Sequence, residues 1–152
     1  MMNKFFILLI FFITSCGYQP LYKSKNEDNN FKINEIQLIG NSEVGKKILV
    51  SLPLVIIKND EDLNKITIEA DKSVIEASKN SKGQATSYRL TIFVKFKILD
   101  SNNKLVSEKT LKKDFSYNAD ENKFRFKEYQ NKIEENLIKD MAEDILFYLN
   151  YS

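Results

Sequence analysis

The residues best placed for covalent chemistry lie near the start of the chain. Cys16 is the single cysteine, and a cysteine thiolate is a strong nucleophile. It follows the apolar residues 5–13 and the small residues Thr14 and Ser15, with Lys4 ahead of the apolar run. A basic start, an apolar stretch of about 7–15 residues and small residues before a cleavage point are typical of a secretory signal. The spacing predicts a signal peptide over residues 1–15, cut before Cys16.

The position of the cysteine directly after this signal also indicates its fate. Residues 13–16 resemble the lipobox of bacterial lipoproteins, in which a large aliphatic residue and two small ones precede the cysteine. Lipid on the Cys16 sulfur would account for an odd cysteine in an exported chain and would tether the protein to a membrane. Two alternatives remain. One is ordinary cleavage with a free thiol, and the other is an uncleaved anchor, although a spanning helix needs about 20 apolar residues.

Other reactive side chains are few. The chain has no His and no Trp, which removes the usual general base, the commonest transition-metal ligand and the Ser-His-Asp scheme. No Gly-rich phosphate loop is present. A paired-carboxylate enzyme remains formally possible, but the acidic pairs, such as Glu134-Glu135, lie where we expect solvent. We therefore predict that the protein is not an enzyme, with no catalytic residues, no cofactor and no metal.

Charge and composition bound the class of protein. Lys and Arg number 23 against 21 Asp and Glu, and this balance argues against a nucleic-acid partner. Residues 16–152 have the length of one ordinary domain. With 11 Phe and 7 Tyr and no second cysteine for a disulfide, the core alone must stabilise the fold. We expect a lipidated tether over residues 16–30 and a single domain over residues 31–152.

Alternation of apolar and polar residues, the mark of a half-buried strand, recurs in four segments. These are residues 31–39, 65–75, 85–99 and 104–117. In the clearest, 85–99, every second residue from Tyr88 to Ile98 is apolar. The opposite face carries Arg89, Thr91, Lys95 and Lys97. A change of phase near Glu35 indicates a bulge, residues 54–57 suit a short strand or a buried loop, and residues 76–84 suit a hairpin loop.

Two segments have the spacing of amphipathic helices. The first follows an N-cap signal at residues 40–42, carries apolar residues at helical spacing from Val44 to Leu52, and ends before Pro53. The second closes the chain, with apolar residues every four positions from Tyr129 to Leu149. The order β-α-β-β-β-α predicts an α+β fold, in which two helices pack on one face of a four-stranded antiparallel or mixed sheet.

The chain also resembles a known family. Residues 16–22, Cys-Gly-Tyr-Gln-Pro-Leu-Tyr, are similar to the CGF-x-PLY start of the alphaproteobacterial type of LPS-assembly lipoprotein, the LptE family. The similarity continues in residues 85–90, which open the long strand, and in residues 141–145 of the last helix. Tyr18 stands where the family usually has Phe.

The resemblance implies a function without catalysis. Such proteins are held by their lipid at the periplasmic face of the outer membrane, form a heterodimer with the β-barrel LptD, fill its lumen as a plug and bind lipopolysaccharide. Gly17 after the cysteine fits sorting to the outer membrane. The alternative is a lipoprotein subunit of an ABC-type lipid transport system at the envelope.

Cationic side chains are the candidates for contacts with lipopolysaccharide, because lipid A carries phosphates. The candidates are Lys79, Lys82, Arg89, Lys112 and Lys113. Exposed lysines are also common in any chain this rich in Lys. The polar face of residues 85–99 would suit a plug, because porin-like barrel lumens are polar.

Overall fold

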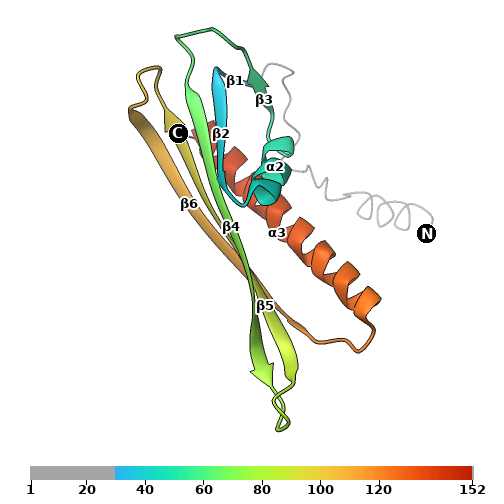
Figure 1. Cartoon of the computed structure of the whole chain (residues 1–152). Coiled ribbons are helices and arrows are strands. Elements are labelled where there is room, and N and C mark those ends of the chain that lie inside the picture. Colours follow the sequence, from blue (N-terminus) through green and yellow to red (C-terminus); the bar gives the residue numbers. More distant parts are fainter. Residues whose placement is uncertain (1–29, 152) are drawn as a thin grey trace, which may run out of the picture.

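The computed structural model describes residues 30–151 of the chain. Within this range, a pair of helices lies on one face of a four-stranded sheet (Figure 1), whose strand order is β2-β4-β5-β6. Its elements are β2 (Glu35–Gly40), α2 (Ser42–Val50), β4 (Lys65–Lys79), β5 (Ala85–Leu99), β6 (Leu105–Asn118) and α3 (Lys123–Tyr151). β2 pairs with β4 in parallel, and the other two pairings are antiparallel. The predicted α+β fold and element order are confirmed, and the sheet is mixed.

The first predicted strand is divided in two. β1 (Phe31–Ile33) pairs in parallel with β3 (Leu54–Ile56) in a separate small sheet, whereas β2 joins the main sheet. Between them the Asn34 N–H donates to the carbonyl of Asn64 at 2.9 Å. The bulge predicted near Glu35 is therefore wrong, because the phase change marks a transfer of the chain from one sheet to the other. The apolar residues 54–57, for which a strand and a buried loop were both open, contribute the strand β3.

Gly40 ends β2 and turns the chain into α2. Its φ of +78° is in the left-handed region, and a Cβ built there would lie 2.3 Å from the carbonyl oxygen of Ala70, so only glycine fits. Asn41 then caps α2 as predicted, because its side chain accepts a hydrogen bond from the Val44 N–H at 3.1 Å. The helix ends at Val50, with Ser51 as its C-cap.

The β4–β5 hairpin is longer than its sequence predicts. β4 continues through residues 76–79, and only residues 80–84 form the turn, where the Asn80 side chain accepts from the N–H groups of Lys82 and Gln84. The end of β4 is exposed on both faces, because this section of the hairpin extends beyond the helices (Figure 1). No apolar alternation is needed where neither face is covered, so the sequence signal stops near Ile75.

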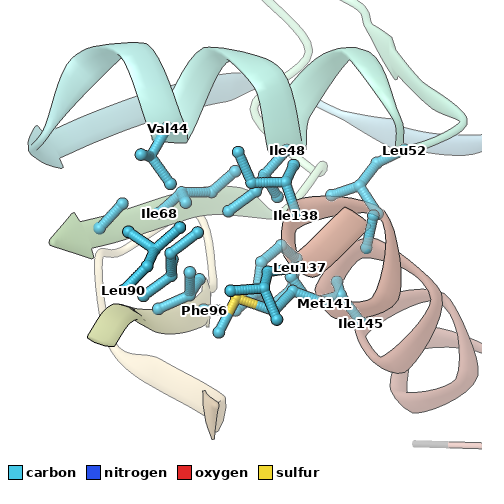
Figure 2. Close-up of a cluster of buried hydrophobic side chains, with 14 of the residues drawn as sticks. Val44, Ile48, Leu52, Ile68, Leu90, Phe96, Leu137, Ile138, Met141 and Ile145 are labelled. Carbon is cyan, nitrogen blue, oxygen red and sulfur yellow. The ribbon is translucent and has the colours of Figure 1, made fainter. Parts of the chain in front are cut away.

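The core lies between the helices and the inner face of β5 (Figure 2). Leu90, Ile92, Val94 and Phe96 alternate along β5 and are at most 1% exposed. They pack with α2 side chains such as Ile48 and with α3 side chains such as Met141 in one buried cluster. The strand periodicity of β5 and the helical periodicity of α3 thus predict the two sides of one interface.

Candidate functional site

The residue predicted to carry lipid, Cys16, lies outside the described residues, as do the predicted signal peptide and residues 16–29 of the predicted tether. The described chain starts at Asn30. The N–H of the next residue, Phe31, donates to the carbonyl of Pro53 at 3.0 Å. The chain therefore enters the fold beside the C-terminal end of α2.

The outer face of the sheet, defined here as the face opposite the helices, holds the polar side chains of β5. Arg89, Thr91, Lys95 and Lys97 alternate with the buried residues of that strand, and no element within residues 30–151 covers them (Figure 1). Charges of both signs meet there. Lys97 lies 3.7 Å from Glu69, and Arg89 lies 3.8 Å from Asp114 and donates to the Ser116 hydroxyl. This face offers polar contacts with little net charge.

The five cationic candidates occupy three separate places. Lys79 and Lys82 lie at the hairpin turn. Arg89 and Lys112 lie on the outer face, because their partners in the register, Ser116 and Phe93, point away from the core. Lys113 pairs with the buried Ile92 and points toward the helices. They do not form one cluster, and their contacts with lipopolysaccharide stay a prediction.

The five candidates also differ in whether their side chains already form ion pairs or hydrogen bonds within the protein. Lys113 lies 2.7 Å from Asp144 and donates to the carbonyl of Asp140, so it joins β6 to α3. Lys79 lies 2.8 Å from Glu76, whose hydrogen bond raises the pKa of Lys79. Among the described residues, the side chains of Lys82 and Lys112 have no such partner. Of the five candidates, Lys82 and Lys112 are therefore the most readily available to an anionic ligand.

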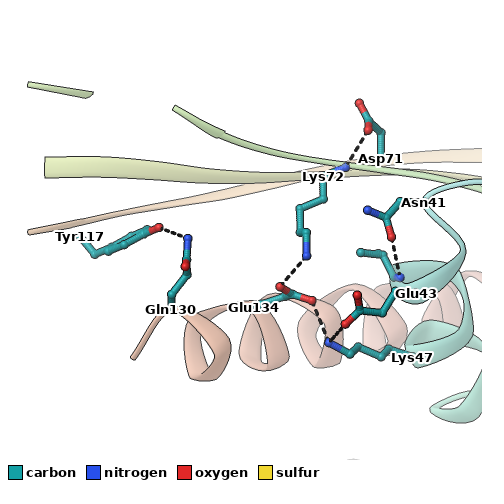
Figure 3. Close-up of polar contacts among 9 residues, drawn as sticks. Asn41, Glu43, Lys47, Asp71, Lys72, Tyr117, Gln130 and Glu134 are labelled. Atoms are coloured by element: carbon teal, nitrogen blue, oxygen red, sulfur yellow. Dashed lines mark hydrogen bonds and ion pairs between the residues drawn. The ribbon is translucent and has the colours of Figure 1, made fainter. Parts of the chain in front are cut away.

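Glu134 corrects a sequence prediction. We expected solvent around this carboxylate, but only 6% of the residue is exposed. Its two oxygens accept hydrogen bonds from Lys47 of α2 at 2.9 Å and Lys72 of β4 at 3.0 Å, and Lys47 also contacts Glu43 (Figure 3). The burial of Glu134 could have been predicted from the sequence. Glu134 lies one helical turn from Ile138 and two turns from Met141, on the buried stripe of α3.

The charged state of this network follows from its contacts. Burial is the largest single influence on Glu134 and raises its pKa, but the hydrogen bonds from Lys47 and Lys72 together outweigh it and leave the pKa below its ordinary value. The hydrogen bond to Glu134 likewise raises the pKa of Lys47. The carboxylate is therefore ionised at neutral pH and joins α2, α3 and β4.

Among residues 30–151, no group of three or more His, Cys, Asp or Glu residues could hold a metal ion. No helix in this range combines the length and apolar character that crossing a membrane requires.

Comparisons with known proteins identify one family. A family model described as LptE, lipopolysaccharide-assembly, matches residues 35–149. No curated protein matches the chain.

Solved structures share the fold. The rare lipoprotein B from Shewanella oneidensis is 14% identical, with a TM-score of 0.60 over 78% of this chain and 95% of that chain. A minor lipoprotein from Acinetobacter baumannii is 22% identical, with a TM-score of 0.56 over 76% of this chain and 87% of that one. Lipoprotein B from Nitrosomonas europaea is 15% identical, with a TM-score of 0.52 over 80% and 86% of the two chains.

Replacement of the buried carboxylate tests its structural role. Glu134→Gln should lower the free energy of unfolding at pH 7 by about 1–3 kcal/mol, because Lys47 and Lys72 lose their shared negative partner. Urea unfolding measures this change. The control is Glu135→Gln at the exposed neighbouring position, which should change stability by less than about 0.5 kcal/mol. Equal unfolding midpoints for the two variants would contradict the assignment.

The stability difference between the wild type and Glu134→Gln should depend on pH, and the pKa of Glu134 gives the sign of that dependence. Because the pKa of Glu134 is lower in the folded chain than its ordinary 4.5, its stabilising contribution is fully present above that ordinary value. The contribution is lost as the pH falls through the folded value. The stability difference between wild type and Glu134→Gln should therefore shrink as the pH falls below 4.5.

Proposed function

The chain belongs to the LptE lipopolysaccharide-assembly family, and from this premise we propose that it partners and plugs an LptD-type β-barrel in the outer membrane. Membership implies a role in lipopolysaccharide assembly. The match over residues 35–149 carries the proposal. We propose further that the chain catalyses no reaction and acts through binding alone.

The outer face of the sheet supports this partnership. A plug must meet the polar lumen of a barrel with polar side chains, and a mixed-sign face such as that around Arg89, Lys97 and Asp114 can make polar contacts without a large net charge. The helices cover the opposite, apolar face. In this arrangement the partner meets the outer face of the sheet.

The tether supports a location at the periplasmic side of the outer membrane. In the proposal, lipid on Cys16 holds the chain there, and residues 16–30 connect the anchor to β1. Fully extended, the 14 residues between Cys16 and Phe31 would span at most about 50 Å. The domain would then stay within reach of a barrel in the same membrane.

Contacts with lipopolysaccharide are assigned to the cations of the hairpin turn and the outer face. Lys79 and Lys82 extend beyond the helices, and Arg89 and Lys112 lie on the outer face. Lys113 would have to leave Asp144 to meet a phosphate, so its contribution to binding should be smaller.

Co-purification tests the partnership. The tagged chain, extracted from outer membranes with detergent, should recover a large β-barrel protein. Thr91→Trp, which adds bulk to the outer face, should reduce that recovery about tenfold through overpacking. Val50→Trp on the solvent side of α2 is the control, because Val50 is 86% exposed. Recovery of transporter subunits without a barrel would favour the ABC-type alternative and overturn the proposal.

Substitution of the proposed anchor tests the location. Cys16→Ser removes the only thiol, and the protein should move from the membrane fraction to the soluble periplasm, as cell fractionation would report. The control is Ser24→Ala in the predicted tether, which should leave the protein membrane-bound. If Cys16→Ser stays in the membrane fraction, lipidation at this residue is not the anchor.

Charge reversal tests the proposed contacts at the hairpin turn. Lys79→Glu with Lys82→Glu should weaken lipopolysaccharide binding by the purified protein by about a hundredfold or more, because charge-assisted hydrogen bonds contribute about 1.5–3 kcal/mol each and each 1.4 kcal/mol is about tenfold in affinity. Lys58→Glu with Lys104→Glu, at exposed positions near the other end of β4 and β5, makes the same change in charge. Equal weakening by both double variants would indicate general electrostatic attraction and would contradict the assignment.

A further inference from the structure

Four aromatic rings gather where β5 and β6 meet the start of α3. Ring centroids lie 5.3 Å apart for Tyr88 and Phe126, 5.7 Å for Tyr117 and Phe126, and 6.3 Å for Tyr117 and Tyr129. Tyr117 is buried and its hydroxyl accepts a hydrogen bond from Gln130 (Figure 3). Tyr129 is 48% exposed. The cluster is therefore fixed on its inner side and presents a ring to solvent on its outer side.

A cavity of about 370 Å³ lies against this cluster. Its lining residues are Asn118, Ala119, Asp120, Arg125, Phe126 and Tyr129. The volume is within the range of small-ligand sites, about 300–1,000 Å³. A second cavity of about 420 Å³ lies between α2 and α3, but no aromatic ring lines it.

Hydrogen bonds hold the wall of the aromatic cavity in place. Asp120 accepts from the Asn122 N–H at 2.9 Å, and Asn122 in turn accepts from the N–H groups of Phe124 and Arg125 at the start of α3. On the other side, the Ala119 N–H donates to the carbonyl of Thr86 at 2.9 Å. The loop between β6 and α3 is thus tied to both neighbouring elements, and a ligand would meet a preformed wall.

Asp120 and Arg125 form a two-point ion pair at the cavity. Arg125 Nε lies 2.6 Å from one carboxylate oxygen and Nη2 lies 2.9 Å from the other. The hydrogen bond from Arg125 holds the pKa of Asp120 below its ordinary value, so both groups are charged at neutral pH and their charges cancel. Across residues 30–151, the Nη1 donors of Arg125 meet no protein acceptor.

From this combination we propose that the cavity binds a neutral saccharide. A pyranose ring has a face of C–H groups that packs on aromatic rings such as Tyr129 and Phe126, and hydroxyls around its rim that both donate and accept hydrogen bonds. Arg125 supplies donors, Asp120 supplies an acceptor and the Asn118 amide supplies both. A free phosphate is disfavoured, because Asp120 already neutralises the guanidinium.

The site deepens the proposed function and rests on it for the source of the sugar. Lipopolysaccharide is a glycolipid, and the cavity lies at the same end of the molecule as the lysines of the hairpin turn. Ala119 bonds to Thr86, the Thr86 hydroxyl lies 2.6 Å from that of Ser78, and Lys79 is the next residue. One ligand that carries both sugar rings and phosphates could meet the aromatic rings and the lysines together.

Amide chemical shifts of the full chain, purified in a detergent without a sugar head group, test this site. Titration with maltose should move the signals of Asn118, Asp120 and Arg125 along saturating curves. Tyr129→Ala should weaken this binding by about tenfold or more, because one stacked ring is lost. Sodium phosphate should leave the same signals in place.

The control is Tyr151→Ala near the other end of α3, where an exposed tyrosine contacts Phe147 with centroids 4.5 Å apart. This variant should bind maltose as the wild type does. If Tyr129→Ala fails to fold, Arg125→Gln at a side chain 71% exposed gives the same comparison. Absence of saturable shifts with maltose, or equal weakening by Tyr151→Ala, would overturn the proposal whatever barrel recovery shows.

Discussion

The structure depends on the unequal faces of β5. Over fifteen residues this strand carries buried aliphatic and aromatic side chains on one face, and on the other mainly polar side chains with Phe93 among them. The helices remove the inner face from water. Because the chain has a single cysteine and cannot form an internal disulfide, this burial must stabilise the fold without a covalent crosslink. α2 and α3 therefore pack on the same side, and the outer face remains polar and uncovered within the described chain. The alternation of side chains along β5 thus already separates the face that stabilises the fold from the face proposed to bind a partner.

The junction of the layers depends on a charge. Glu134 on α3 binds Lys47 on α2 and Lys72 on β4. A buried ion pair is weak evidence for stability, since desolvation offsets much of the attraction. Its geometric effect is clearer, because a carboxylate shared by two lysines restricts how α2 can shift relative to α3. Lys72 also marks how far along β4 the helices reach, since β4 is exposed beyond Ser73.

Periodicity predicts the elements that are covered on one face. β5 and α3 show it over many residues, and in both the sequence indicates the face that is buried. Periodicity fails where neither face of a strand is covered, and for this reason the sequence predicts a loop over residues 76–79. It also fails where the chain passes from one sheet to another, as at Asn34. Glu134 is misjudged when its charge is weighed above its place on the helical stripe. The aromatic cavity could not be predicted, because Tyr88, Tyr117 and Phe126 meet only when three elements converge.

The lengths of the strands separate two ends of the molecule. The chain enters the fold at Phe31, beside Pro53 and near the start of β4, whereas the hairpin turn lies at the far end of that strand, 15 residues later. At about 3.3 Å per residue such a strand spans roughly 50 Å. A tether that enters at one end would therefore leave the hairpin lysines and the aromatic cavity far from its point of entry. Because β4 and β5 extend past the helices, the hairpin exposes both faces of the sheet, and a ligand can approach its lysines without displacing any part of the core.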